Sequence, residues 1–398
     1  MIVDAAPLAG LTVVDLGQIY NAPYATLLLA LNGANVIKVE PPTGENLRGR
    51  GKVAGAGAPF GMLNSNKKAV TLNLKRPEGI ALIEQMVAKA DVVVENFRPG
   101  VTDKLGIGPD RLREINPRLI YASGSGYGSS GPYRDLPAMD ITIQAMSGVM
   151  SVTGFPDREP VKAGPAIGDF LGGIHLYGAI TTALYQREQT GRGTRVEVAM
   201  LDSIYPSLMS SLGLFFGSTG DIPTRTGNRH SGLAESPYNV YPAADGHVAL
   251  ICVSEAHWRA LTTLMDRPEL ADDPSYVTRV ARVARIDEID AMVGDWTRHR
   301  TKQELAELFN GAGVPSAPVR EIAEVVADPH LRQRGMLREI DHPDMGPLVV
   351  PHSPIRVGDH YAEIVPSPGL GQHNHEVYGG WLGLDAEEIA ALEKDGVI

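Results

Sequence analysis

Short apolar runs rich in β-branched residues alternate with helix-like segments through the first 125 residues, and this alternation constrains the fold most. The pattern predicts strands over 11–16, 35–40, 69–74, 91–95 and 119–123, and helices over 23–31, 77–89 and 108–115. A strand, a helix and a second strand within about 30 residues form a βαβ unit, whose strands pair in parallel. Repetition of this unit predicts an α/β fold with a doubly wound parallel sheet.

The second half of the chain has a different character. Residues 217–236 are rich in Gly, Thr, Arg and Ser, which is typical of a linker. Beyond them the pattern predicts two strands and three helices, over 238–241, 247–253, 256–265, 286–296 and 302–312. We therefore expect a smaller α+β domain at 225–325. A closing helix over 386–394 is expected to pack on the main body.

Composition narrows the classes of function. The chain of 398 residues carries a net charge of −11, which argues against a general nucleic-acid binder because phosphate contacts need a surplus of Lys and Arg. Cys252 is the only cysteine, which excludes an intrachain disulfide and a cysteine-based metal site. The first residues lack the pattern of a secretory signal, and no apolar run approaches the roughly 20 residues that cross a bilayer. We expect a cytoplasmic protein without a membrane partner.

Several familiar active-site motifs are missing. The turn after the first strand reads GQIYNA at 17–22 rather than GxGxxG, which disfavours a nicotinamide or flavin enzyme. Ser125 has serine, not glycine, two positions before it, so it does not match the nucleophile elbow of a serine hydrolase. No HExxH-like spacing is present, and no metal site is expected at His230, His373 or His375.

One carboxylate stands in an unusual setting. Asp169 lies between Gly168 and the pair Gly172–Gly173, ahead of a small-residue apolar run that is typical of a helix. Small neighbours let backbone or a bulky ligand approach the carboxylate, and the start of a helix presents the positive end of its dipole. Asp is also a favoured N-cap residue, so a purely structural role is the alternative interpretation.

Two basic clusters lie at the ends of predicted strands, where ligands bind in open parallel sheets. They consist of Lys67, Lys68, Lys75 and Arg76 around the strand at 69–74, and Arg98 and Lys104 after the strand at 91–95. In an acidic protein, local cations of this kind favour a phosphate-bearing cofactor. Ordinary surface Lys and Arg are the alternative.

The chain resembles the family III CoA-transferases, which include formyl-CoA:oxalate and carnitine CoA-transferases and, as a relative, α-methylacyl-CoA racemase. The matching segments follow one another in order over nearly the whole chain, at 11–42, 64–79, 90–100, 144–154, 166–184, 190–203 and 236–246. Among them are NSNKKAVTLNLKRPEG, ADVVVENFRPG and AIGDFLGGIHLYGAITTAL.

The resemblance implies roles for individual residues. Asp169 falls on the family's catalytic nucleophile. The contacts to coenzyme A, which enters as an acyl-CoA substrate, fall on Gln18, Ile19, Leu72, Asn73, Lys75, Asn96, Phe97, Arg98, Lys104 and Leu105. The pocket for a small carboxylic acid falls on Tyr20, Met139 and Asp140. The implied chemistry attaches CoA to Asp169 as a thioester, with backbone N–H groups near Gly168, Gly172 or Gly173 as candidates to stabilise the oxyanions.

The family's architecture is implied as well. It consists of a Rossmann-like large domain built from both chain ends (1–200 and 330–398), a linker at 201–224, and the small domain at 225–325. Two ring-like subunits interlock as a homodimer.

The sequence departs from the family at informative positions. A racemase needs a second base, and the histidine expected before Asp140 is replaced by Met139, which disfavours isomerisation. The glutamine that some members use aligns with Tyr20, and the tetraglycine loop of the oxalate-specific enzyme is missing. We therefore expect a CoA-transferase that acts through Asp169. An acyl-CoA isomerase and a non-catalytic acyl-CoA-binding protein are the alternatives.

Overall fold

The computed structural model describes residues 6–50, 57–219, 223–358 and 360–398. The chain divides into a first unit, made of Met1–Ile143, Pro165–Ile204 and Asp328–Ile398, and a second unit, made of Gln144–Gly164 and Tyr205–Ala327. The division expected from sequence differs in two places. Residues 144–164 group with the second unit, and much of the expected linker at 201–224 is helical.

The first unit is built on a parallel sheet, which confirms the α/β prediction. Among the described residues its strands are β1 (Thr12–Asp15), β2 (Asn35–Glu40), β3 (Lys68–Thr71), β4 (Val92–Glu95), β5 (Ile120–Ser125) and β6 (Arg195–Ala199). They pair in the order β3-β2-β1-β4-β5-β6, and every pairing is parallel. The order reverses between β1 and β4, so the crevice at their carboxyl ends is where a ligand is expected.

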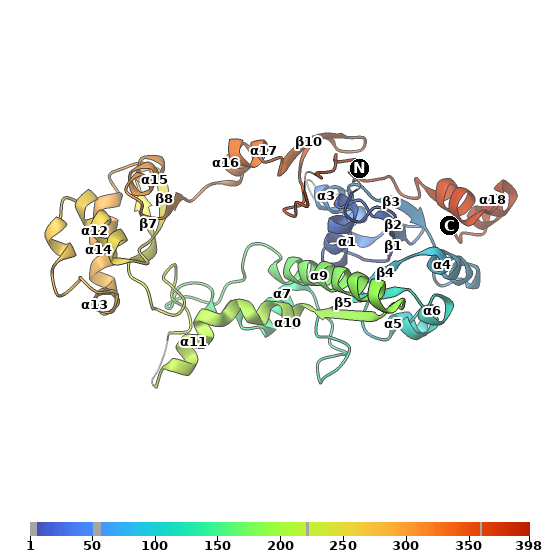
Figure 1. Cartoon of the computed structure of the whole chain (residues 1–398), viewed down its shortest axis with the longest axis horizontal. Helices are drawn as coiled ribbons and strands as arrows, with labels where there is room; N and C mark the ends of the chain where they lie inside the picture. Colours follow the sequence, from blue (N-terminus) through green and yellow to red (C-terminus); the bar gives the residue numbers. More distant parts are fainter. Residues whose placement is uncertain (1–5, 51–56, 220–222, 359) are drawn as a thin grey trace. The chain divides into compact units, whose positions relative to one another are not determined.

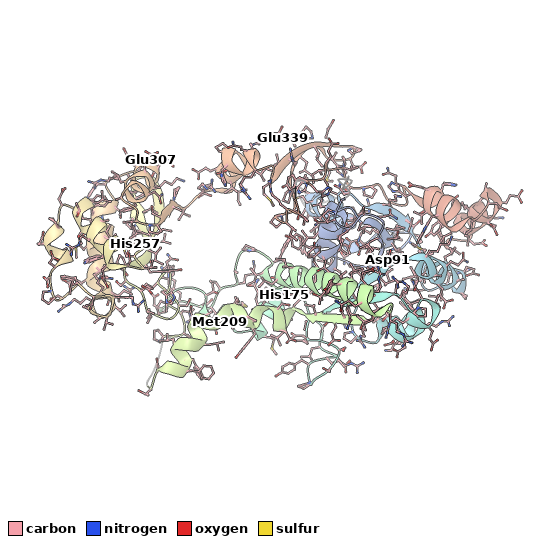
Figure 2. All side chains as sticks on the ribbon, in the orientation of Figure 1. Asp91, His175, Met209, His257, Glu307 and Glu339 are labelled. Carbon is pink, nitrogen blue, oxygen red and sulfur yellow. The ribbon has the colours of Figure 1, made fainter. Side chains whose placement is uncertain are left out.

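Both faces of the sheet are covered because successive side chains of each strand point to opposite sides. Val14 packs in the cluster with α4 (Pro77–Lys89), α6 (Pro109–Ile115) and the C-terminal segment. Val13 packs in the cluster with α1 (Asn21–Leu31) and α9 (Ile167–Thr190). In Figure 1, α1 and α9 lie on the same side of the sheet, and these two helices are in contact. Arg187, in the last turn of α9, forms an ion pair with Asp91, which directly precedes β4 (Figure 2). The distance from Arg187 Nη1 to Asp91 Oδ1 is 2.9 Å, and this ion pair holds the C-terminal end of α9 to the start of β4.

The remaining elements of the first unit are mostly helical. They are α1 (Asn21–Leu31), α2 (Asn46–Gly49), α3 (Ala58–Asn64), α4 (Pro77–Lys89), α5 (Val101–Lys104), α6 (Pro109–Ile115), α9 (Ile167–Thr190), α10 (Met200–Ile204), α17 (Pro329–Gln333), the π-helical η4 (His375–Leu382) and α18 (Ala386–Lys394), with the hairpin of β10 (Leu337–His342) and β11 (Gly346–Pro351). Helix α7 (Asp140–Met146) runs across the division. Ile389 of α18 packs in the same core cluster as Val14 and α4, so the closing helix packs on the main body as expected.

The second unit carries a smaller antiparallel sheet with helices around it. Its elements are α8 (Val149–Val152), η2 (Tyr205–Leu208), α11 (Met209–Gly217), β7 (Tyr238–Ala243), β8 (Gly246–Ile251), α12 (Glu255–Leu264), η3 (Pro268–Ala271), α13 (Arg279–Val283), α14 (Ile286–Thr297), α15 (Lys302–Gly311), β9 (Ser316–Pro318) and α16 (Ile322–Val326). The sheet order is β7-β8-β9, and Trp258 and Phe309 lie in its core. The strands and helices expected here are confirmed within a few residues. In the described part of the chain, no helix has the length and apolar character to span a bilayer.

Candidate active site

A cavity of about 470 Å³ opens at the carboxyl ends of β1, β4 and β5, where the strand order reverses. Its lining includes seven residues singled out from the sequence, namely Gln18, Ile19, Asn96, Phe97, Arg98, Met139 and Asp169. They come from segments far apart in the chain, and the parallel sheet brings them together because the loops after β1 and β4 share one edge. This cavity belongs entirely to the first unit.

Asp169 lies in the first turn of α9, and its side chain is nearly enclosed, with 8% of the residue exposed. The N-cap is Ala166, so the interpretation of Asp169 as the N-cap is wrong. Burial, with a smaller contribution from the charge of Asp140, raises the pKa of Asp169 from 3.8 to about 7. A carboxylate with little hydration is a stronger nucleophile than one in water.

Gly172 and Gly173, which follow Asp169 on α9, allow Asn21 to pack closely against the helix. A Cβ at Gly172 would lie 2.2 Å from Nδ2 of Asn21, and a Cβ at Gly173 would lie 2.7 Å from the carbonyl oxygen of Asn21. These distances are far too short for any side chain, so the backbone of α9 directly contacts the side chain and the carbonyl oxygen of Asn21. The expected close approach is present, and the group that approaches is Asn21.

The backbone N–H groups of Gly168, Gly172 and Gly173, which were candidates to stabilise the oxyanions, already form hydrogen bonds within the protein. The N–H of Gly168 donates to Oδ1 of Asp140 at 2.8 Å. Gly172 and Gly173 lie in the second turn of α9, where N–H groups bond to the preceding turn of the helix. The bond from Gly168 also explains the position of Asp140, which holds the start of α9 and adds negative charge near Asp169 without lining the cavity.

A buried ion pair fixes the turn after β1. Lys67 Nζ lies 3.0 Å from Asp15 Oδ2, with both side chains fully buried. Burial opposes the charge of Asp15, but Lys67 and Lys38 outweigh it and hold the pKa of this carboxyl below its usual range. Asp15 Oδ1 accepts the N–H of Gly17, and Lys38 donates to the Gly17 carbonyl, each at 2.8 Å. The network therefore shapes the loop that leads to Gln18 and Ile19.

Asn96, which directly follows β4, forms hydrogen bonds with the loop that contains Gln18. Its Oδ1 accepts the backbone N–H of Gln18 at 2.8 Å, and its Nδ2 donates to the Gln18 carbonyl at 2.9 Å. This reciprocal pair ties together the two loops that follow β1 and β4. Asn96 thus lines the cavity and shapes it, while its amide group is committed to backbone.

The other residues inferred from the resemblance lie outside the lining described for this cavity: Tyr20, Leu72, Asn73, Lys75, Lys104, Leu105 and Asp140. Leu72 is buried in the core, and Asn73 bonds to the chain end through the carbonyls of Val397 and Gly396. Tyr20 packs near the ring of Phe170, with centroids 6.0 Å apart. Two lysines of the first basic cluster form ion pairs within the protein: Lys67 pairs with Asp15, and Lys68 pairs with Glu376.

Sequence reasoning missed several lining residues, among them Asn21, Ser125, Tyr127, Arg134 and Met200. Asn21 directly precedes the Ala-Pro pair at the start of α1, which is a weak signal on its own. His175 lies six residues after Asp169 on α9, is exposed, and does not line the cavity (Figure 2). Among the described residues, no cluster of three or more His, Cys, Asp or Glu is arranged to hold a metal ion.

Comparison with known proteins identifies the family. The model of CoA-transferase family III matches residues 8–374. The chain belongs to CoA-transferase family III. It is 39% identical over 407 residues to a formyl-CoA:oxalate CoA-transferase of Streptomyces avermitilis, covering 98% of this chain and 99% of that protein. It is 35% identical over 390 residues to a succinate–glutarate CoA-transferase of Agrobacterium fabrum, covering 93% and 94%.

A solved structure supports the same assignment for the fold. A CAIB/BAIF family protein from Brucella suis superimposes with a TM-score of 0.82 at 35% identity, covering 94% of this chain and 99% of that chain. This CoA-transferase therefore shares its fold along almost the whole chain.

Proposed function

We propose that this CoA-transferase moves CoA from an acyl-CoA to a free carboxylic acid through a thioester on Asp169. The observation that carries the proposal is the position of Asp169, a desolvated carboxyl in the wall of the cavity at the reversal of strand order. Its pKa of about 7 leaves a substantial fraction ionised at neutral pH, and the ionised form is the nucleophile.

The reaction divides into steps that balance without any further reagent. A carboxylate oxygen of Asp169 attacks the thioester carbon, the C–S bond breaks, and CoA leaves as a thiolate. The thiolate then attacks the Asp169 carbonyl of the mixed anhydride, which releases the donor acid and leaves CoA on Asp169. The acceptor carboxylate repeats these steps in reverse order. Since both thioesters have similar energy, the enzyme lowers barriers and does not drive an uphill reaction.

The lining of the cavity supports CoA as its ligand. Arg98 and Arg134 supply cations at the rim for the phosphates, and Phe97, Leu136 and Met139 supply apolar surface for the pantetheine arm. We propose CoA contacts also for Gln18, Ile19 and Asn96. Leu72, Asn73, Lys75, Lys104 and Leu105 would contact the nucleotide only outside this cavity.

The acceptor is proposed to be a short dicarboxylic acid. The names of relatives pair CoA with oxalate, or with succinate and glutarate. Met139 lines the cavity where a racemase would need a second base, and a thioether cannot carry a proton. This favours transfer over isomerisation. The interlocked homodimer and the cytoplasmic location remain proposals of the same kind.

Covalent trapping tests the proposal. The protein is mixed with succinyl-CoA, quenched with borohydride or hydroxylamine, and analysed by intact mass and peptide mapping. We expect modification of Asp169 alone, and none in Asp169→Ala. The matched control is Asp140→Asn, which keeps an oxygen for the Gly168 N–H and should still be modified. Turnover retained by Asp169→Ala, or modification at another carboxyl, would contradict the assignment.

A further inference from the structure

Glu95 is the last residue of β4, and its side chain holds the loop that follows the strand. The residue is 6% exposed, and its Oε2 accepts the backbone N–H of Phe97 at 2.8 Å. Ser123 of β5, which pairs with Glu95 in the register of the two strands, forms a second hydrogen bond with the carboxyl group. The side chain is therefore anchored on β5 while it fixes the peptide bond between Asn96 and Phe97.

The peptide that Glu95 holds carries two parts of the cavity wall. On one side of it is Asn96, whose amide makes both hydrogen bonds to the backbone of Gln18, and on the other side is Phe97. Both residues line the cavity that contains Asp169, whereas Glu95 lies outside its described lining. A change in the direction of this peptide would therefore move Asn96 and Phe97 together.

The loop after β4 has little packing that could replace this hydrogen bond. A second cavity, of about 220 Å³, adjoins the loop, and Glu95 lines it. Phe97, Arg98 and Pro99 line both cavities. A segment between two hollows has few packing contacts, so its conformation depends strongly on its hydrogen bonds.

The electrostatics of Glu95 favour a role in shaping the loop over a role in stability. Burial raises the pKa of Glu95 to about 7, although the hydrogen bonds that its carboxyl group accepts favour the ionised form. An ionised Glu95 therefore lowers the stability of the fold, which an uncharged side chain would not do. Asp15, at the end of β1, accepts the N–H of Gly17 in the same way, but its charge is balanced by the buried Lys67.

We propose that Glu95 is a positioning residue for acyl-CoA, since its carboxyl oxygen orients the Asn96–Phe97 peptide that forms part of the CoA-binding wall. This step rests on the proposed function, in which Asn96 and Phe97 contact CoA. Because Glu95 lies outside the described lining around Asp169, it acts on the affinity for CoA and not on the chemical step. Loss of the oxygen should weaken binding and leave the saturated rate nearly unchanged.

Two substitutions separate the accepting oxygen from the charge. Glu95→Gln removes the charge and keeps an oxygen for the Phe97 N–H, whereas Glu95→Met removes both and keeps the length of the side chain. Asp273→Leu is the matched control. Oδ1 of Asp273 accepts the N–H of Ser275 at 2.7 Å, two residues further along the chain, and Asp273 belongs to the second unit.

Binding and single-turnover rates are measured on the full-length protein. Calorimetry gives the dissociation constant of CoA, and intact mass gives the rate of Asp169 modification against the concentration of succinyl-CoA. In Glu95→Met we expect the dissociation constant and the half-saturating concentration to rise about tenfold, because the Phe97 N–H loses its acceptor. The saturated rate should stay within about twofold of the wild-type value, and Glu95→Gln and Asp273→Leu should resemble the wild-type protein throughout.

Every outcome of these measurements supports or overturns the inference. Wild-type affinity for CoA in Glu95→Met overturns it. Binding by Glu95→Gln as weak as that of Glu95→Met also overturns it, because the charge and not the oxygen would then be responsible. A tenfold lower saturated rate, or a Glu95→Met protein that is unfolded by far-UV circular dichroism, would assign Glu95 to another role and overturn it as well. A wild-type protein that does not bind CoA would instead overturn the proposed function, so the two failures are distinguishable.

Discussion

Replacing Asp169 by asparagine should stabilise the protein, and by more as the pH rises. In the unfolded chain the carboxyl ionises with a pKa near 3.8, whereas burial and Asp140 raise the pKa of the folded group to about 7. Between these values the unfolded state releases a proton that the folded state keeps. Stability is therefore fully present below pH 3.8 and falls as the pH rises toward and through 7.

The size of the effect follows from the same two pKa values. The full loss above the folded pKa corresponds to about 4 kcal/mol, of which about 2–3 kcal/mol is lost between pH 5 and pH 8. Asparagine has nearly the same shape and no proton to lose. The difference in unfolding free energy between Asp169→Asn and the wild-type protein should therefore grow by about 2–3 kcal/mol over this range.

Urea denaturation followed by far-UV circular dichroism, at unit pH steps from 5 to 8, measures this difference. Asp395→Asn is the matched control, because Asp395 is an exposed aspartate at the end of α18 whose carboxylate is in water in both states. It controls for the loss of one carboxylate at a site that does not line the cavity. A flat or shrinking difference for Asp169→Asn would refute the reasoning that burial penalises this carboxylate.

Three further outcomes are expected. The value of kcat/KM should rise with pH through about 7 as Asp169 ionises, and in Asp140→Asn this midpoint should move to lower pH; an unmoved midpoint would show that Asp140 does not repel the charge. Lys67→Met should lower the unfolding free energy by about 3–5 kcal/mol in urea because it leaves Asp15 buried without its ion pair, and adding Asp15→Asn should restore part of the loss if the unpaired charge is the cause. Burial raises the pKa of the Cys252 thiol to about 12, so iodoacetamide should label the urea-unfolded protein and leave the native protein unlabelled; rapid native labelling would contradict the burial of this thiol.

The parallel sheet was predictable from sequence because its signal is local. Strands buried on both faces read as apolar β-branched runs, such as the VVD of β1 and the VVVE of β4, and the helices between them carry their own start and stop signals. The reversal of strand order then fixes where a ligand binds. The family resemblance predicted Gln18 and Asn96 as contacts to one ligand, and the shared edge of the parallel sheet explains how they meet, although 78 residues separate them.

The arrangement of side chains around the cavity depends on contacts between distant residues, which no local sequence pattern encodes. Lys67 was interpreted as part of a cationic site, but its ammonium group is buried against Asp15, and only the packed sheet reveals this. Asn21 gave almost no signal in the sequence, because the side chain packs against Gly124 and Gly172, which lie 103 and 151 residues away in the chain. A glycine shows in the sequence that space is needed, and the structure is required to show what fills it.

The magnitudes at Asp169 indicate which force governs the ionisation of its carboxyl group. A carboxylate in the first turn of a helix gains about 0.3–1 kcal/mol from the dipole, and about 2 kcal/mol in a partly buried setting, which lowers its pKa. Burial and the charge of Asp140 act in the opposite direction and raise the pKa to about 7, which corresponds to a penalty of about 4 kcal/mol. This penalty is larger than the gain from the helix terminus. In the mechanism that we propose, a poorly solvated carboxylate has less hydration to lose when it attacks a thioester, so the free energy that destabilises the ionised folded state would reduce the barrier to the first step.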